Sequence, residues 1–546
     1  AVREGRASLK PDEIVKTDTK IKFREGSQTV AIHDTLAAIK KGKKHFLWDA
    51  KMRFGKTLTS LEVARQMNYG KVLIITHRPE VDKDWFKDFN TLFAKTDYRY
   101  GSRSQGENIS NLRSRCIRKP DGSCINPFIY FASIQYLRHQ KVSPEKRAIL
   151  DEDWDMLIID EADEGVKTAL ADEIISQITR KFTLMLSGTP FNLLEDYEAD
   201  EIYSWDYTKE QELKQKWDEL HPDEPNPYYK LPKLSIYTYA LDKYLHTTDF
   251  ENLYDKAFNF KEFFRTDDDG SFIHEQYVVR YLLTTESDNN FPYSRSDFRN
   301  NLRHMLWIVP GVKEARALEK LLRKHPIFGM KDNNDRYYFN IANIAGEGNE
   351  EVAEKESRKL VRSAITDDPL SAYSITISCG KMTRGVSVPE WTAVFMLSNT
   401  SSASTYLQTI FRAQTPWEYQ GLVKQDCFVF DFAPDRTLNV VAETMKIKKK
   451  SPTKAEVKEA TSKFLNFCPV ISVSEGRMEE FSPSRLLHAI KRVAIQKVTR
   501  NGFDDTRLYN LDNLEHCSDE ELADFAEWNR IVGQSSSGVK DANKIK

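Results

Sequence analysis

The stretch HFLWDAKMRFGKTLTSLEVARQ, His45–Gln66, decides the fold because it contains most of a phosphate-binding loop. The full pattern is G-x-x-x-x-G-K-[ST], and the matching frame begins at Ala50, which takes the place of the first glycine. An apolar run precedes the loop and a helical pattern follows it. In such a loop, backbone N–H groups and the helix N-terminus hold phosphates, while the lysine and the hydroxyl reach phosphate and Mg²⁺. Gly55, Lys56 and Thr57 are therefore predicted to bind ATP, with Thr57 as a Mg²⁺ ligand.

A downstream acidic motif supports this interpretation. The stretch MLIIDEADEG places Asp160, Glu161 and Asp163 directly after a continuous apolar run. A carboxylate at the C-terminal end of a buried parallel strand can hold Mg²⁺ beside a phosphate loop, and a neighbouring carboxylate can polarise the attacking water. We therefore expect Asp160 to bind Mg²⁺ and nucleotide and Glu161 to act catalytically. The competing interpretation is a solvated acidic turn, which leaves the upstream loop unexplained.

Composition sets further bounds on the function. The 546 residues include 80 Lys and Arg against 82 Asp and Glu, a formal net charge of -2, so any basic surface must be local. No apolar run approaches the length of about 18 residues that a membrane span needs, and no signal peptide opens the chain. The six cysteines lack metal-ligand spacing, so we expect reduced thiols in a cytoplasmic protein. The first residue is Ala1, as expected for a piece excised from a longer protein.

The chain alternates apolar runs with helical patterns in two separate regions. Continuous apolar runs suit parallel strands buried on both faces, so the predicted fold class is α/β with two α/β halves. We expect an N-terminal extension over 1–20, a first α/β domain over 21–205, a connector or insertion over 206–295, a second α/β domain over 296–440 and a charged helical region over 441–546. The predicted strands are Lys71–Thr76, Phe128–Ser133, Asp155–Asp160, Phe182–Pro190, His304–Pro310, Tyr373–Cys379, Ala393–Asn399 and Cys427–Ala433.

Together these motifs resemble a superfamily 2 helicase or translocase motor, of the DExD/H-box type, over residues 20–440. The resemblance implies two tandem RecA-like parallel-sheet domains that hydrolyse ATP with Mg²⁺ between them and move on nucleic acid. The stretch FREGSQTVAI resembles the entry segment that contacts adenine, with Arg24 and Gln28 as candidates.

Several other stretches resemble motifs that touch the nucleic-acid strand or link it to hydrolysis. ITHRPEV and FASIQYL resemble motif Ia and its successor, SGTP resembles motif III, HMLWIVPGVKEA resembles motif IV, and CGKMTRGVSVPEW resembles motif V. Such motors grip mainly the sugar-phosphate backbone. The residues implied to contact nucleic acid are Arg78, Gln135, Lys381 and Arg384, and those implied to couple contact to hydrolysis are Asp163, Ser187, Thr189 and Gly385.

The stretch QTIFRAQ resembles motif VI. The resemblance implies that Gln408 and Arg412 approach the γ-phosphate from the second domain, where an arginine stabilises transition-state charge. The competing interpretation is a surface arginine on a helix. This motif departs from the usual pattern because Thr415 stands where a second arginine is common, and motif V has Ser387 where Asp is common. The arginine finger is therefore Arg412 alone or shared with Arg384.

A finer resemblance concerns the biological setting. MRFGKT, SGTPF and FRAQTPW resemble the motors of bacterial restriction and mobile-element defence proteins, and the SAT and H-R-x-G-R-x-x-R strings of DEAD-box RNA helicases are absent. This implies duplex DNA as the partner, with a nuclease or methyltransferase subunit or fused domain outside this chain. Pro11–Lys16 begins like a nuclease motif but lacks the Glu-x-Lys partner. The alternatives are an RNA helicase and a nucleotide-gated switch or scaffold with little turnover.

Overall fold

The computed structural model describes the chain in two compact units that divide between Trp205 and Asp206. The described residues are 21–77, 79–138, 143–162, 169–188, 193, 196–239, 259–286, 290–346, 350–379, 388–398, 403–433, 437, 454–474 and 477–486.

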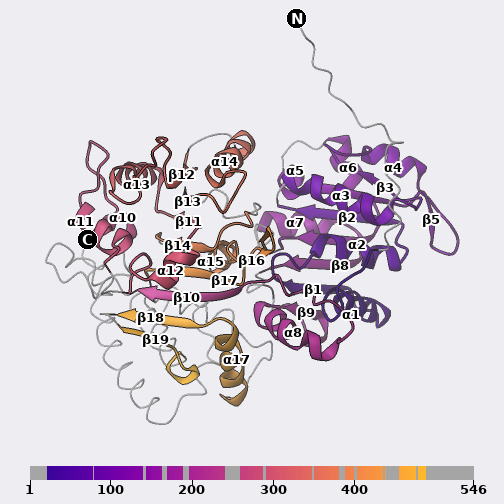
Figure 1. Ribbon diagram of the computed structural model, residues 1–546. Coiled ribbons are helices and arrows are strands. Elements are labelled where there is room, and N and C mark those ends of the chain that lie inside the picture. The colour runs from indigo at the N-terminus through magenta and orange to yellow at the C-terminus, as the bar shows by residue number, and fades with distance from the viewer. Residues whose placement is uncertain are drawn as a thin grey trace, which may run out of the picture. The chain divides into compact units, whose positions relative to one another are not determined.

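The first unit is built on a seven-stranded parallel sheet with the strand order β3-β6-β2-β7-β8-β1-β9 (Figure 1). Its inner strands are continuous apolar runs, and all residues of β6 are buried, as expected for strands covered on both faces. The strands are β1 His45–Ala50, β2 Lys71–Thr76, β3 Arg99–Gly101, β6 Phe128–Ser133, β7 Trp154–Asp160, β8 Arg180–Ser187 and β9 Ile202–Trp205, with a separate hairpin of β4 Ile117–Arg118 and β5 Cys124–Ile125.

The helices of this unit pack in two groups. Helices α4 to α7 supply apolar side chains to a cluster with one set of strand residues, while α2 contacts both α1 and α3. Local signals fix helix starts: before α6, the Ser143 hydroxyl accepts from the Lys146 N–H at 3.1 Å and Pro144 takes the first helical position, where its missing N–H is harmless. The helices are α1 Gln28–Lys40, α2 Lys56–Gln66, α3 Asp82–Phe93, α4 Ile109–Arg115, α5 Ile134–Arg138, α6 Pro144–Leu150 and α7 Ala169–Gln177.

The second unit is built on an eight-stranded sheet with the order β12-β13-β11-β14-β17-β10-β18-β19 (Figure 1). All neighbouring strands are parallel except β18 and β19, which form an antiparallel pair. The strands are β10 Lys233–Tyr239, β11 His304–Ile308, β12 Phe339–Asn343, β13 Tyr373–Ser378, β14 Ala393–Met396, β17 Asp426–Asp431, β18 Val470–Ser474 and β19 Arg477–Glu480.

Two predicted segments differ from the sequence interpretation. Residues 206–295 were expected to be a connector or insertion, and residues 441–546 a helical region. In the structure the first segment contributes β10, which lies inside the second sheet between β17 and β18, and the second segment contributes the expected helical structure in α17 together with β18 and β19. The reason is tertiary: Lys233 pairs with Asp426 across a long stretch of chain, and no local sequence pattern records which distant strand a run will join.

The core of the second unit is rich in aromatic side chains. Trp307 and Phe395 stack with ring centroids 4.7 Å apart, and both are fully buried. Offset aromatic pairs stabilise the folded state by about 0.5–1.5 kcal/mol beyond the burial of their apolar area. The geometry of the ring contacts therefore adds to the stability of this core. The helices of the unit are α8 Tyr207–Leu220, α10 Phe260–Phe263, α11 Glu275–Val278, α12 Ser296–Asn301, α13 Val312–Lys324, α14 Glu350–Ile365, α15 Ala403–Ile410 and α17 Lys454–Phe467.

The α/β fold class with two tandem parallel-sheet domains is confirmed. The predicted runs Lys71–Thr76 and Phe128–Ser133 coincide with β2 and β6, and the predicted helix after the phosphate loop is α2. Of the site residues predicted from the sequence, six lie outside the described residues: Arg78, Asp163, Thr189, Lys381, Arg384 and Gly385.

Candidate nucleotide and nucleic-acid site

The phosphate loop joins the end of β1 to the start of α2. Two of its residues have left-handed backbone, Arg53 with φ 67° and Gly55 with φ 89°, and glycine adopts that conformation without a Cβ clash. The loop therefore turns sharply, and α2 begins at Lys56 with its first N–H groups at the loop. A helix N-terminus of this kind favours phosphate. The Lys56 Nζ donates to the Ala50 carbonyl at 2.8 Å, so the ammonium lies over the loop.

The missing first glycine has a structural explanation. Ala50 is the last residue of β1 and pairs in parallel register with Trp205. Its side chain is fully buried. This position therefore has ordinary strand backbone, which any L-residue adopts, and the loop forms its turn with Arg53 and Gly55 instead.

Arg24 and Gln28, predicted to bind nucleotide, hold the backbone of the loop. The Gln28 Nε2 donates to the Phe54 carbonyl at 2.9 Å, and an Arg24 guanidinium N–H donates to the same carbonyl at 2.5 Å and to the Arg53 carbonyl at 3.2 Å. The Arg24 backbone N–H in turn donates to the Gln28 Oε1 at 2.8 Å. The entry segment thus holds the backbone of the loop through Gln28, the first residue of α1, and through Arg24, which precedes that helix.

The acidic motif lies at the same edge of the sheet. Asp160 is the last residue of β7, and Glu161 follows with φ 53°, its N–H donating to the Asp160 Oδ1 at 3.1 Å. One strand, β8, separates β7 from β1, and the register places Asp160 level with Trp48, about 10 Å away at two strand spacings and two residues before the loop start at Ala50. A triphosphate with Mg²⁺ spans such a gap.

The donor set at this edge fits Mg²⁺. The metal takes hard oxygen ligands and usually keeps one or two carboxylates plus phosphate oxygens. The carboxylate of Asp160 ends β7, and the hydroxyl of Thr57 stands in the first turn of α2. No group of three or more His, Cys, Asp or Glu suited to a metal occurs among the residues that the model describes.

The motif III segment contacts the phosphate loop through Gly188. A Cβ added to Gly188 would lie 3.7 Å from both the Ala50 carbonyl oxygen and the Lys56 Nζ. Ser187, predicted to couple hydrolysis to strand contact, ends β8 and is fully buried beside Asp49 in the β1–β8 register. Gly188 therefore lies beside the phosphate loop and its lysine.

The predicted nucleic-acid contact Gln135 is exposed in the first turn of α5, just after β6 ends. The next residue, Tyr136, packs against an arginine that belongs to none of the recognised motifs. The Arg103 guanidinium lies over the Tyr136 ring, 4.5 Å from the ring centroid. Arg103 also lies 3.9 Å from the Glu145 carboxylate, with a 63% exposed side chain. No sequence signal marked Arg103, because the strand before it has only three residues.

A buried aspartate fixes the loop that carries Arg103. The Asp82 carboxylate accepts hydrogen bonds from the hydroxyls of Tyr100 at 2.7 Å, Ser102 at 2.6 Å and Ser104 at 2.5 Å. Burial and the Asp82 carboxylate together raise the pKa of the Tyr100 hydroxyl, which therefore stays a donor. Asp82 begins α3, directly after the predicted motif Ia stretch. Its carboxylate therefore connects the end of that stretch to the loop that carries Arg103.

In the second unit, Gln408 lies in α15 and Arg412 in the turn that follows. Both are buried, with exposed fractions of 6% and 2%, so Arg412 is not a surface arginine of a helix. The Thr415 hydroxyl donates to the Arg412 carbonyl at 2.8 Å. Thr415 therefore closes this turn, at the position where motif VI commonly has a second arginine.

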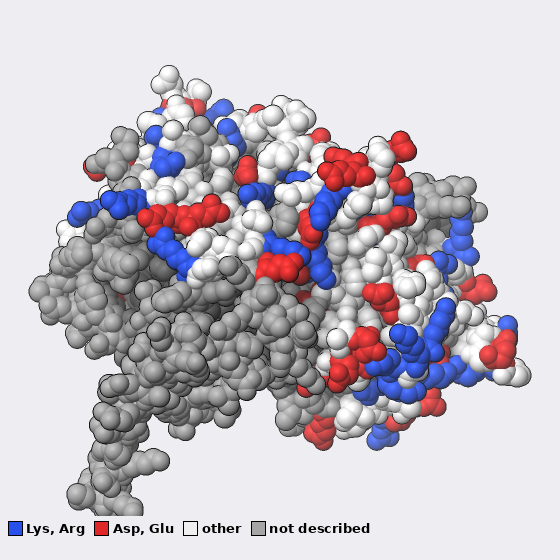
Figure 2. Space-filling model, turned by 90° about the horizontal axis from the view of Figure 1, so that it is seen from below, with Lys and Arg blue, Asp and Glu red and all other residues white. Residues whose placement is uncertain are grey.

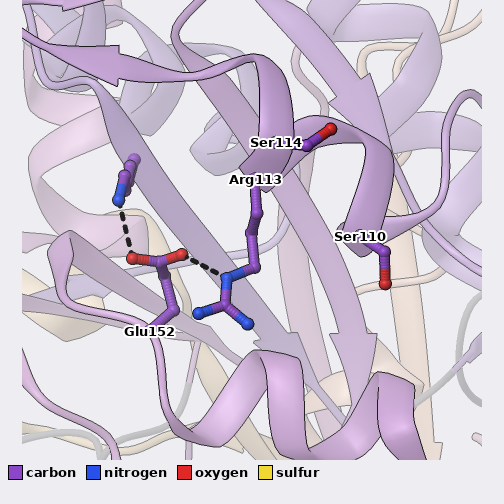
Figure 3. A pocket seen from close by; sticks show the side chains of 5 residues that line it. Ser110, Arg113, Ser114 and Glu152 are labelled. Atoms are coloured by element: carbon purple, nitrogen blue, oxygen red, sulfur yellow. Dashed lines mark hydrogen bonds and ion pairs between the residues drawn. The ribbon is translucent and has the colours of Figure 1, made fainter.

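A pocket at the opposite end of the first sheet has a structural role. The Glu152 carboxylate binds the Lys71 Nζ and the Arg113 Nε, both at 2.7 Å, and Ser110 and Ser114 complete the lining (Figure 3). Lys71 begins β2, whose far end faces the candidate site. The pocket therefore anchors α4 to the sheet, away from the phosphate loop.

The distribution of charge agrees with the near-zero net charge of the chain. On the described part of the face drawn in Figure 2, Lys and Arg side chains lie among Asp and Glu side chains. A basic contact surface must therefore be assembled locally, from residues such as Arg103.

Comparisons with known proteins agree with this geometry. Residues 20–192 match the model of the family described as type III restriction enzyme, res subunit. The predicted resemblance to superfamily 2 restriction motors is confirmed. The matched motor segment contains the phosphate loop, the acidic motif and the motif III segment.

A curated relative and a solved structure extend the likeness beyond this motor segment. A protein of Mycoplasma pneumoniae, described as the C-terminal part of a type II restriction enzyme and methyltransferase, is 25% identical over 88% of this chain and 73% of its own length. The DNA-bound ATP-dependent type ISP restriction-modification enzyme LlaBIII superposes with a TM-score of 0.52 at 16% identity over 88% of this chain, which supports the fold. The chain spans only 33% of the length of LlaBIII. Among the described residues, no helix is both long enough and apolar enough to cross a membrane.

Proposed function

We propose that the chain is the ATP-driven motor of a restriction system and that it moves on duplex DNA. The observation that carries this proposal is that the Lys56 ammonium, the end of β7 at Asp160 and the Gly188 segment all lie at one edge of the first sheet. The similar proteins, a restriction enzyme and a DNA-bound restriction-modification enzyme, support the restriction setting and DNA as the partner.

In this proposal each residue has one task. Backbone N–H groups of the loop and Lys56 bind the phosphates, and Thr57 and Asp160 hold Mg²⁺, which neutralises phosphate charge when bound. Glu161 orients the attacking water and takes its proton. Gln408 and Arg412 stabilise charge on the transferring phosphate.

On the DNA side, four residues in motif Ia, its successor motif and motif V contact the sugar-phosphate backbone. These are Arg78, Gln135, Lys381 and Arg384, and the coupling residues are Asp163, Ser187, Thr189 and Gly385. A nuclease or methyltransferase, fused or separate, would complete the system.

The test of the partner is stimulation of steady-state ATP hydrolysis by duplex DNA, single-stranded DNA and RNA. We expect duplex DNA to stimulate more than RNA, and the stimulation to fall as salt rises, because phosphate contacts release counterions. Displacement of a triplex-forming strand would report movement without strand separation. Strong stimulation by RNA with none by duplex DNA would reject the DNA motor and favour an RNA helicase.

Arg412→Ala is expected to lower kcat at least about tenfold while ATP binding changes little, because the arginine acts in the transition state. Steady-state kinetics over a range of ATP concentrations measures both quantities. The matched control is Arg299→Ala, which removes an exposed arginine of α12 in the same unit and should leave kcat unchanged. Weaker ATP binding with intact turnover at saturation would contradict this role.

A further inference from the structure

A buried lysine holds the turn that follows Arg412. Lys424 is 6% exposed, and its Nζ donates to the backbone carbonyls of Pro389 at 2.7 Å, Trp391 at 2.9 Å and Ala413 at 2.8 Å. An ammonium has three N–H donors, so the three carbonyls match its hydrogen-bonding capacity. A buried ammonium is unfavourable unless such partners surround it, which makes this arrangement a specific one.

A short hairpin delivers this side chain to the turn. Strands β15 Glu418–Tyr419 and β16 Leu422–Val423 pair antiparallel, and the two residues between them, Gln420 and Gly421, have φ values of 50° and 81°. Positive φ at both central residues is what a tight two-residue hairpin needs. The hairpin reverses the chain after the motif VI turn, so that Lys424 reaches back to it.

The three carbonyls belong to two segments that sequence comparison links to the motor. Pro389 and Trp391 lie at the end of the motif V stretch, just before β14, while Ala413 is bonded directly to Arg412. If the ammonium is removed, these buried carbonyls lose their donor, and both segments must rearrange to find others. The backbone of Arg412 is then no longer fixed relative to the motif V segment.

We propose that Lys424 is a positioning residue that sets the placement of Arg412 for ATP hydrolysis and ties it to the motif V segment. This inference rests on the proposed ATPase function and adds to it a residue outside the recognised motifs. The three acceptors are backbone carbonyls, one of them next to Arg412, so the proposed effect of Lys424 on catalysis passes through the placement of Arg412.

The test is a double-mutant comparison in the full chain with duplex DNA present. Lys424→Met keeps an unbranched apolar stem of similar length and removes the charge together with the three N–H donors. We expect it to lower kcat at least about fivefold, because small misplacements of a catalytic group slow turnover strongly, while the KM for ATP changes less than about twofold. In an Arg412→Ala background, Lys424→Met should lower kcat less than about twofold further, since residues that act as a unit are non-additive.

Two additional variants separate positioning from general destabilisation. Lys320→Met removes an exposed lysine of α13 whose Nζ also binds a backbone carbonyl, that of Asp269 at 3.1 Å, and should leave kcat unchanged. If Lys424→Met does not fold by circular dichroism, Lys424→Gln, whose amide keeps two donors, replaces it in the same comparison.

The outcomes distinguish this inference from the function on which it rests. If the wild-type chain hydrolyses ATP and the losses from Lys424 and Arg412 variants multiply, or if KM rises as much as kcat falls, the positioning role is rejected and the motor function stands. If the wild-type chain shows no nucleotide turnover with any nucleic acid, the proposed function fails first and this inference fails with it.

Discussion

Lys56→Ala abolishes ATP hydrolysis in the proposed motor, and this is the largest effect expected of any single substitution. The Lys56 ammonium lies over the loop, 2.8 Å from the Ala50 carbonyl, and it is the cation placed to meet the β- and γ-phosphates. We expect the steady-state rate with duplex DNA to fall at least about 10³-fold, the scale on which transition-state charge stabilisation is lost. A phosphate-release assay measures this rate.

The matched control for that substitution is Lys41→Ala, which removes an exposed lysine from the turn before β1. It changes the net charge equally and should leave the rate unchanged. Thermal unfolding of both variants should match wild type, because Lys56 contributes one partly buried hydrogen bond to stability, worth about 1 kcal/mol. Turnover near wild type in Lys56→Ala would mean that this loop does not bind the reacting phosphate.

Glu161→Gln is expected to bind ATP normally and to turn it over about 10²-fold more slowly or worse, the scale of general-base removal. The amide keeps the size of the side chain and loses the negative charge that orients water. The backbone at this position is already held with φ 53°, and its N–H donates to Asp160, so the substitution leaves the loop in place. Single-turnover kinetics would separate binding of ATP from its hydrolysis.

Glu173→Gln is the control for the catalytic carboxylate. Glu173 is an exposed residue of α7 in the same unit, and its replacement should change neither binding nor turnover. A loss smaller than about threefold in Glu161→Gln would fall short of general-base removal and would assign the water-orienting role to another residue.

Much of the fold could be predicted from local patterns. Continuous apolar runs such as Phe128–Ser133 coincide with strands because a strand covered on both faces must be apolar at every position. The phosphate loop and the acidic motif were recognisable because phosphate chemistry needs a lysine, a hydroxyl and carboxylates at strand ends, which fixes both residue type and order along the chain.

The sequence by itself therefore determined the α/β class, the resemblance to superfamily 2 restriction motors and the candidate residues Lys56, Asp160 and Glu161. The tertiary structure explained why alanine can stand at the position where the loop pattern usually has glycine, since the backbone of Ala50 belongs to β1. It also placed β10 inside the second sheet and brought Lys424 to the carbonyl after Arg412. The physical reason is the range of the interactions: a helix or a loop turn is set by neighbours in sequence, whereas strand partners and buried hydrogen bonds are chosen among residues far apart in the chain.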